Sequence, residues 1–208
     1  MKKYMDKLTY KLKTNKKVII FLLVLTTIGI ISGTIFSLVI SSDDKTLVLN
    51  QINGFFESIK NNSLNPLEAF KNSVIDNYSV TLVIWLLGIS IIGLPIIIFL
   101  FFSKSFIIGF TIGNIIMNYK VKGLLISLIY IFPHHIINIL LYTILIIYSL
   151  ALSVKLIYSI LKRKSIDFKP IINKYLYILL ICIVGFCLTS LYEAFIMPKL
   201  INLILPVA

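Results

Sequence analysis

The chain has 208 residues, of which 59% are hydrophobic and 13% are charged, and its net charge is +12. A soluble domain carries roughly 25% charged residues, so about half that proportion excludes a separate water-soluble enzyme domain. The positive charge does not indicate nucleic-acid binding, because seven lysines lie within residues 1–17 and six basic residues lie between Lys155 and Lys174, beside apolar segments. We therefore expect an all-α, polytopic membrane protein that forms one integral membrane domain over residues 1–208.

The amino-terminal region predicts a basic helix followed by the first membrane span. Apolar residues recur at helical spacing within residues 1–17, from Tyr4 to Leu12, among the lysines. This pattern is typical of an interfacial helix on the cytoplasmic leaflet. Residues 18–40 then carry no charge, which is long enough to cross a hydrocarbon core of about 30 Å at about 1.5 Å per residue.

Residues 41–77 form the most polar segment and are expected to be extracytoplasmic. Five carboxylates against three lysines give this segment a net charge of −2. Asn65, Pro66 and Glu68 fit the N-cap, N1 and N3 positions of a helix, and the apolar residues form stripes, so two short amphipathic helices are predicted. Their apolar faces either dock a partner or pack on the spans below. The candidate docking residues are Phe55, Phe56 and Phe70.

The run from Ile84 to Gly113 is thirty residues of apolar sequence with a single charge, Lys104. We expect Tyr78–Phe102 to be the second full span and Lys104 to mark the cytoplasmic turn after it. Because small residues let membrane helices approach closely, the glycines of this run are interpreted as packing contacts within a bundle. The motif residues here are Gly88, Gly93, Pro95, Gly109 and Gly113.

The region between Lys104 and the basic loop at 161–174 must cross an even number of times if both are cytoplasmic. Pro133 breaks the long apolar stretch, so we expect two crossings with interrupted helices that turn at Lys120. His134 follows the proline, and no third ligand stands at a suitable position. We therefore interpret His134 as a polar group at a broken helix rather than a metal ligand.

The last span is expected at Tyr175–Met197, ended by Pro198. Glu193 lies inside it, and a carboxylate within a span costs several kcal/mol unless it is protonated, paired or near water. A structural or gating role for Glu193 in the bundle interior is favoured, with exposure at the outer headgroups as the alternative. The prediction is about five spans, one or two of them broken or short, with the amino terminus cytoplasmic and the carboxyl terminus extracytoplasmic.

Motifs that carry enzymatic chemistry are missing from this sequence. It contains no P-loop, no G-x-S-x-G and no H-E-x-x-H, and no pair of carboxylates is placed to share acid and base roles. We therefore expect no enzymatic activity, no cofactor and no metal site.

The order of four motifs resembles the stage II sporulation protein M family. The motifs are LLGISIIGLP at 86–95, KSFIIGFTIG at 104–113, the Pro-His pair at 133 and 134, and SLYEAFIMP at 190–198. Ser105 replaces a glycine of the family pattern, and Asn138 stands where many members have a glutamate. The terminal glutamate of the family corresponds to Glu193.

The resemblance implies a membrane protein of engulfment that organises peptidoglycan-degrading partners, the stage II sporulation proteins D and P. Similar proteins also occur beside bacteriocin genes, so the alternative is a permease-like subunit for secretion or immunity. Such a subunit would act with an ABC-type ATPase, and the basic loop at 161–174 is its candidate contact. Membrane lipid is the remaining expected partner of the chain.

Overall fold

The computed structural model describes residues 2–90, 92–162 and 169–204. Within these ranges all regular secondary structure is helical, which confirms the all-α prediction. The elements are α1 (Lys2–Val39), α2 (Ser42–Lys60), α3 (Pro66–Gly88), α4 (Gly93–Tyr130), the π-helix η1 (Ile131–His135), α5 (Ile136–Lys162), α6 (Lys169–Leu191), the π-helix η2 (Tyr192–Ile196) and α7 (Met197–Ile204).

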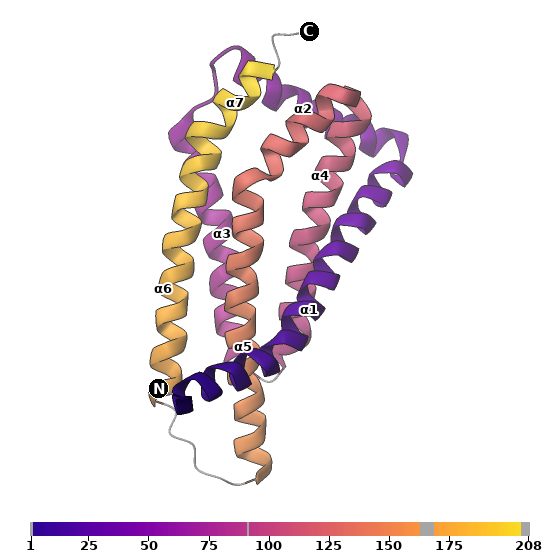
Figure 1. The fold of residues 1–208 in the computed structure, drawn as a ribbon. Coiled ribbons are helices and arrows are strands. Elements are labelled where there is room, and N and C mark those ends of the chain that lie inside the picture. Colours follow the sequence, from indigo (N-terminus) through magenta and orange to yellow (C-terminus); the bar gives the residue numbers. More distant parts are fainter. Residues whose placement is uncertain (1, 91, 163–168, 205–208) are drawn as a thin grey trace.

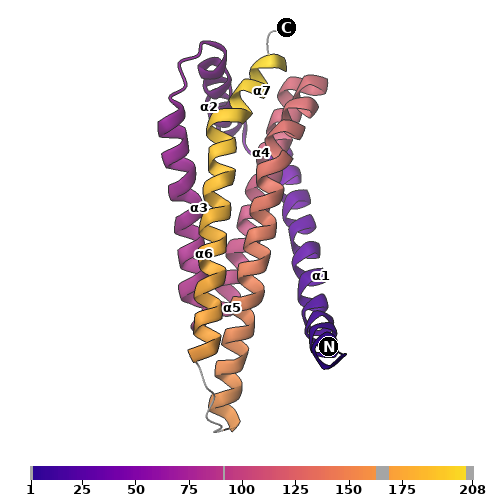
Figure 2. The same cartoon turned by 60° about the vertical axis from the view of Figure 1, so that its left-hand side comes forward.

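The long helices run side by side as a bundle (Figure 1). The helices α2 and α7 lie at one end of it, and the amino terminus lies toward the other. The helices α3, α5 and α6 pack on one another, whereas α1 packs mainly on α4 at the edge of the bundle (Figure 2). The expected interfacial helix at 1–17 is continuous with the first span inside α1.

Among the described residues, four segments are long and apolar enough to cross a membrane: Lys16–Val39, Gly93–Tyr130, Pro133–Ile157 and Lys169–Leu203. The helix α3 runs beside them and carries charges in its first half, and it is not one of these four. About five spans were expected, against four apolar segments found among the described residues. The N-cap predicted for α3 is confirmed, because Asn65 Oδ1 accepts hydrogen bonds from the N–H groups of Leu67 (3.1 Å) and Glu68 (3.4 Å). The basic loop expected at 161–174 lies partly outside the described residues.

The predicted span Tyr78–Phe102 is wrong, because α3 ends at Gly88 and α4 begins at Gly93. The turn between them needs no charge, since Ser153 Oγ on α5 donates to the Gly88 carbonyl oxygen at 2.7 Å and so satisfies part of the exposed helix end. Lys104 therefore does not mark a cytoplasmic turn. It lies eleven residues after the first residue of α4, roughly 16 Å along the helix at 1.5 Å per residue.

Lys120 marks the reversal that the sequence predicted within this region. Its backbone has φ 49° and ψ −123°, outside the helical range, and it joins two helices within α4. The chain then returns along the bundle through the second part of α4, η1 and α5 (Figure 1). This arrangement agrees with the expected pair of interrupted crossings, although the first of them begins at Gly93 rather than after Lys104.

Pro133 and Pro198 each lie in or just after a π-helical turn. Pro133 lies within η1, and Pro198 is the second residue of α7, two positions after η2 ends at Ile196. Proline cannot donate a backbone hydrogen bond and its ring crowds the preceding turn, so a widened π turn accommodates it without ending the helix. The prediction that Pro198 ends the last helix is therefore wrong, since α7 continues to Ile204.

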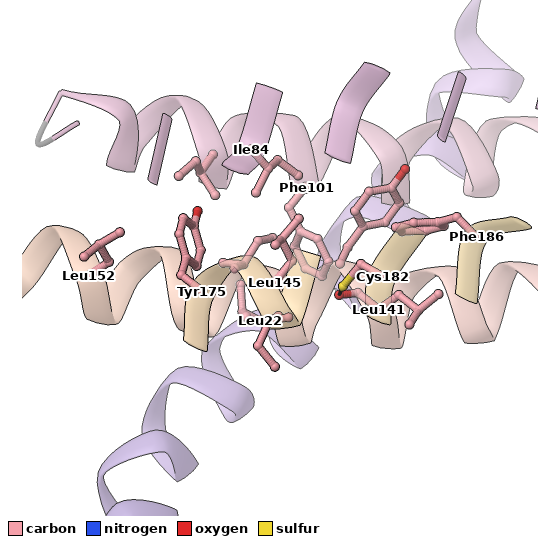
Figure 3. Packing of buried hydrophobic residues seen from close by; sticks show 13 residues of the cluster. Leu22, Ile84, Phe101, Leu141, Leu145, Leu152, Tyr175, Cys182 and Phe186 are labelled. Carbon is pink, nitrogen blue, oxygen red and sulfur yellow. Dashed lines mark hydrogen bonds between the residues drawn. The ribbon is translucent and has the colours of Figure 1, made fainter. Parts of the chain in front are cut away.

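The main hydrophobic core fills the space between α3, α4, α5 and α6 (Figure 3). Phe101 and Phe186 are its largest fully buried side chains, and Leu22 of α1 joins it. Because these side chains come from five helices, the core fixes how the passages are arranged.

The helices α1 and α4 approach closely through glycines. A Cβ atom at Gly33 would overlap the Phe106 carbonyl oxygen, and one at Gly109 would overlap the Ile30 carbonyl oxygen. Thr34 Oγ1 also donates to the Gly109 carbonyl oxygen at 3.0 Å. These contacts agree with the interpretation of the glycines as packing residues.

Candidate functional site

A polar cavity of about 160 Å³ lies between the spans. It is enclosed by α3, α4, α5 and the two π-helices, and Lys104 and Glu193 line it together. The π-helical interruptions matter here, because such segments are frequent at functional sites. The lining residues are Ser73, Asp76, Asn77, Lys104, Ile107, Ile108, Tyr130, His135, Asn138, Ile139, Tyr142 and Glu193.

A chain of hydrogen bonds leads to the carboxylate of Glu193. Ser73 Oγ lies 2.6 Å from Glu193 Oε2 and 2.8 Å from Ser190 Oγ. Asn77 Nδ2 donates to Ser190 Oγ at 3.4 Å, and Tyr142 OH donates to Asn77 Oδ1 at 3.2 Å. The chain connects α3, α5, α6 and η2, so the polar groups of four elements stabilise one another away from water.

Charged groups of both signs face this cavity. Lys104 lines it from the part of α4 before the kink at Lys120, Asp76 from the first half of α3, and Glu193 from η2. An ionisable group at such a depth is costly unless it has partners or reaches water, so charged residues inside spans mark functional sites. Glu193 thus lies toward the interior of the bundle, where the sequence analysis expected it, and its role stays a prediction.

The two histidines of η1 have different surroundings. His134 is fully buried, and its ring lies 5.9 Å from the Tyr192 ring and 4.1 Å from the His135 ring. Neither ring nitrogen of His134 has a hydrogen-bond partner, whereas His135 lines the cavity. No group of three metal-ligating side chains occurs among the described residues.

The remaining motif residues lie elsewhere. Gly88, Gly93 and Pro95 surround the turn between α3 and α4, far along α4 from the kink at Lys120. Gly109 and Gly113 face α1, where a Cβ at Gly113 would overlap Ser37 Oγ. The sequence analysis singled out Lys104 and Glu193 separately, and nothing in it predicted that they line the same cavity.

Several cavity residues were not predicted as site residues. Ser73, Asn77, His135, Asn138 and Tyr142 all line the cavity or its hydrogen-bond chain. The sequence signal that could have identified them is that they are polar residues within or beside apolar segments. Asn138 accepts a hydrogen bond from Thr189 Oγ1 through its Oδ1 at 2.6 Å.

The three candidate docking phenylalanines differ in accessibility. Phe56 is only 6% exposed and packs with Ile59 in a second hydrophobic cluster formed by α2, α4 and α7. Phe70 is half-buried, with its ring 6.5 Å from the Phe195 ring. Phe55, at 37% exposure, is the most accessible. Phe56 therefore holds α2 on the bundle, as the packing alternative expects, whereas Phe55 and Phe70 are partly accessible.

The bundle of apolar passages around a charged cavity defines a polytopic α-helical membrane protein. The family model of stage II sporulation protein M matches residues 18–198, and the chain belongs to this family. It is therefore a multi-pass membrane protein associated with sporulation. No match is found among curated proteins or among solved structures.

Proposed function

We propose that the protein is a non-enzymatic organiser of peptidoglycan-remodelling enzymes during engulfment, with stage II sporulation proteins D and P as its partners. The observation that carries this proposal is a set of exposed apolar side chains on α2 and at the start of α3. Leu47, Phe55 and Leu67 are 63%, 37% and 72% exposed. Exposed apolar side chains on a polar segment favour a protein interface.

The orientation of the chain supports this location for the interface. We propose that the basic amino terminus is cytoplasmic, as the positive-inside rule favours. The α2 end then faces the cell wall, where peptidoglycan enzymes act. Because Phe56 and Ile59 hold α2 on the bundle, the exposed side chain of Leu47 is carried by a fixed element.

The test replaces Leu47, Phe55 and Leu67 with serine and measures recovery of the peptidoglycan enzymes with the protein from sporulating cells. Recovery and engulfment are expected to fall while the membrane level of the protein is unchanged. The matched control, Leu47→Met with Phe55→Leu and Leu67→Met, keeps the surface apolar and should retain both. Normal recovery with the serine variant would remove this surface from the proposal.

A second candidate function is a permease-like subunit for bacteriocin secretion or immunity, working with an ABC-type ATPase. The polar cavity favours it, because Lys104, Asp76 and Glu193 face a space between spans. Lys104→Gln and Glu193→Gln separate the two functions. A permease-like subunit would lose secretion or immunity in these variants, whereas an organiser would keep enzyme recruitment.

A further inference from the structure

A second pocket, independent of the polar cavity, lies between α5 and α6 at the opposite end of the bundle from α2. Its volume is about 320 Å³, about twice that of an engineered cavity of ~150 Å³ that holds benzene. Its apolar wall is formed by Ala151, Leu152 and Ile171. Lys155 and Lys174 also line the pocket.

The groove lies beside the turn between α3 and α4, which indicates its level in the membrane. Ser153, beside Leu152, donates to the Gly88 carbonyl oxygen at 2.7 Å, and Tyr175 OH donates to the Trp85 carbonyl oxygen at 2.9 Å. The groove is therefore level with the place where one passage ends and the next begins. Tyr175 also stacks on Trp85 with ring centroids 5.6 Å apart. Aromatic pairs at such ends are typical of the membrane–water interface.

The charged side chains among the described residues that line the groove are both lysines. Lys155 and Lys174 are both exposed, and no carboxylate is among the described residues that line the groove. Lys174 Nζ lies 5.2 Å from the centroid of the Tyr148 ring, which holds the ammonium over the groove. Two ammonium groups above an apolar wall complement an anionic headgroup with attached hydrocarbon.

We propose that this groove binds an anionic phospholipid, with Lys155 and Lys174 contacting the phosphate and the wall around Leu152 contacting the first part of an acyl chain. A zwitterionic lipid carries its own cation and would repel the lysine pair in part. A free phosphate would leave the apolar wall exposed. The two chemical features of the groove together therefore select a lipid of net negative charge.

The full-length protein, purified in detergent, is titrated with phosphatidylglycerol or phosphatidylcholine, and bound lipid is measured by native mass spectrometry. The wild type should bind phosphatidylglycerol more tightly than phosphatidylcholine. Lys155→Gln with Lys174→Gln should weaken phosphatidylglycerol binding by about tenfold or more. The matched control, Lys60→Gln with Lys199→Gln, removes two exposed lysines at the other end and should change nothing.

A separate variant tests the apolar part without changing charge. Ala151→Trp fills the groove and should also weaken phosphatidylglycerol binding, and size-exclusion elution reports whether each variant is folded. Equal affinity of the wild type for both lipids, or unchanged binding in both groove variants, would overturn the proposal. Competition by millimolar inorganic phosphate as effective as that by lipid would overturn it too, because the groove would then be an anion site.

Discussion

Ser73 Oγ on α3 lies 2.6 Å from Glu193 Oε2 on η2, which joins the first half of α3 to the π-helical turn after α6. The two residues are 120 positions apart in the chain. Their contact explains how a carboxylate can remain within an apolar segment, because a donor from another helix meets it. It also places a polar link directly between α3 and the end of α6.

Removal of the Ser73 hydroxyl is expected to destabilise the protein. Ser73→Ala leaves the half-buried Glu193 carboxylate without this donor, a loss of about 1–3 kcal/mol. Unfolding by SDS titration in mixed micelles measures the change. Ser58→Ala is the control, because Ser58 Oγ donates only to the Gly54 carbonyl oxygen of its own exposed helix. Equal stability of the two variants would contradict a structural role for the Ser73–Glu193 bond.

The α1–α4 contact predicts that alanine is not tolerated at Gly109. The added Cβ would overlap the Ile30 carbonyl oxygen, so the helices must separate at a cost of about 1–3 kcal/mol. Gly54 provides the matched control, since a Cβ there meets nothing within 4 Å. Gly54→Ala should be neutral or stabilising by up to about 1 kcal/mol, because alanine favours a helix.

The same SDS titration compares the two glycine variants. A drop in stability confined to Gly109→Ala supports close backbone packing. If both substitutions raise stability, the helices do not approach through this glycine, and α1 must be held by other contacts.

The sequence predicted the local signals of this fold well. Asn65 was identified as an N-cap because its side chain acts on backbone groups only a few residues away. Lys120 was identified as a turn because charges accumulate there between apolar segments. Such features depend on neighbours along the chain, so a pattern of residue types is sufficient to find them.

The misplaced second span shows what local patterns omit. The turn after Gly88 is mostly apolar, so its sequence carries no turn signal of its own. The carbonyl oxygen of Gly88 accepts a hydrogen bond from Ser153 of α5, which is 65 positions away in the chain. Lys104 was the only charge nearby and was therefore interpreted as the turn. Its actual surroundings, a cavity shared with Glu193, depend on contacts between distant segments. The better signal was glycine at the end of one helix and Pro95 in the first turn of the next.

The network around Tyr175 predicts a further stability effect. Tyr175 OH donates to the Trp85 carbonyl oxygen at 2.9 Å and lies 2.7 Å from Ser149 Oγ, so it joins α3, α5 and α6. Tyr175→Phe should cost about 1–2 kcal/mol in the free energy of unfolding. Tyr177→Phe is the control, because Tyr177 is 63% exposed on the same helix and should change stability by less than about 0.5 kcal/mol. A similar loss in both variants would assign the effect to the general loss of a hydroxyl.

The corrected position of Lys104 gives a topology prediction. Ser90 and Lys120 lie at opposite ends of the first passage of α4, and both are exposed. In a variant with Cys182 and Cys187 replaced by serine, single cysteines at positions 90 and 120 should react with a membrane-impermeant maleimide from opposite sides of the membrane. A cysteine at position 104 should react more slowly than both, because its site lies roughly 16 Å along the helix from Gly93. If Lys104 were instead a cytoplasmic turn, position 104 would react rapidly from the cytoplasmic side, and position 90 would be protected within a continuous span.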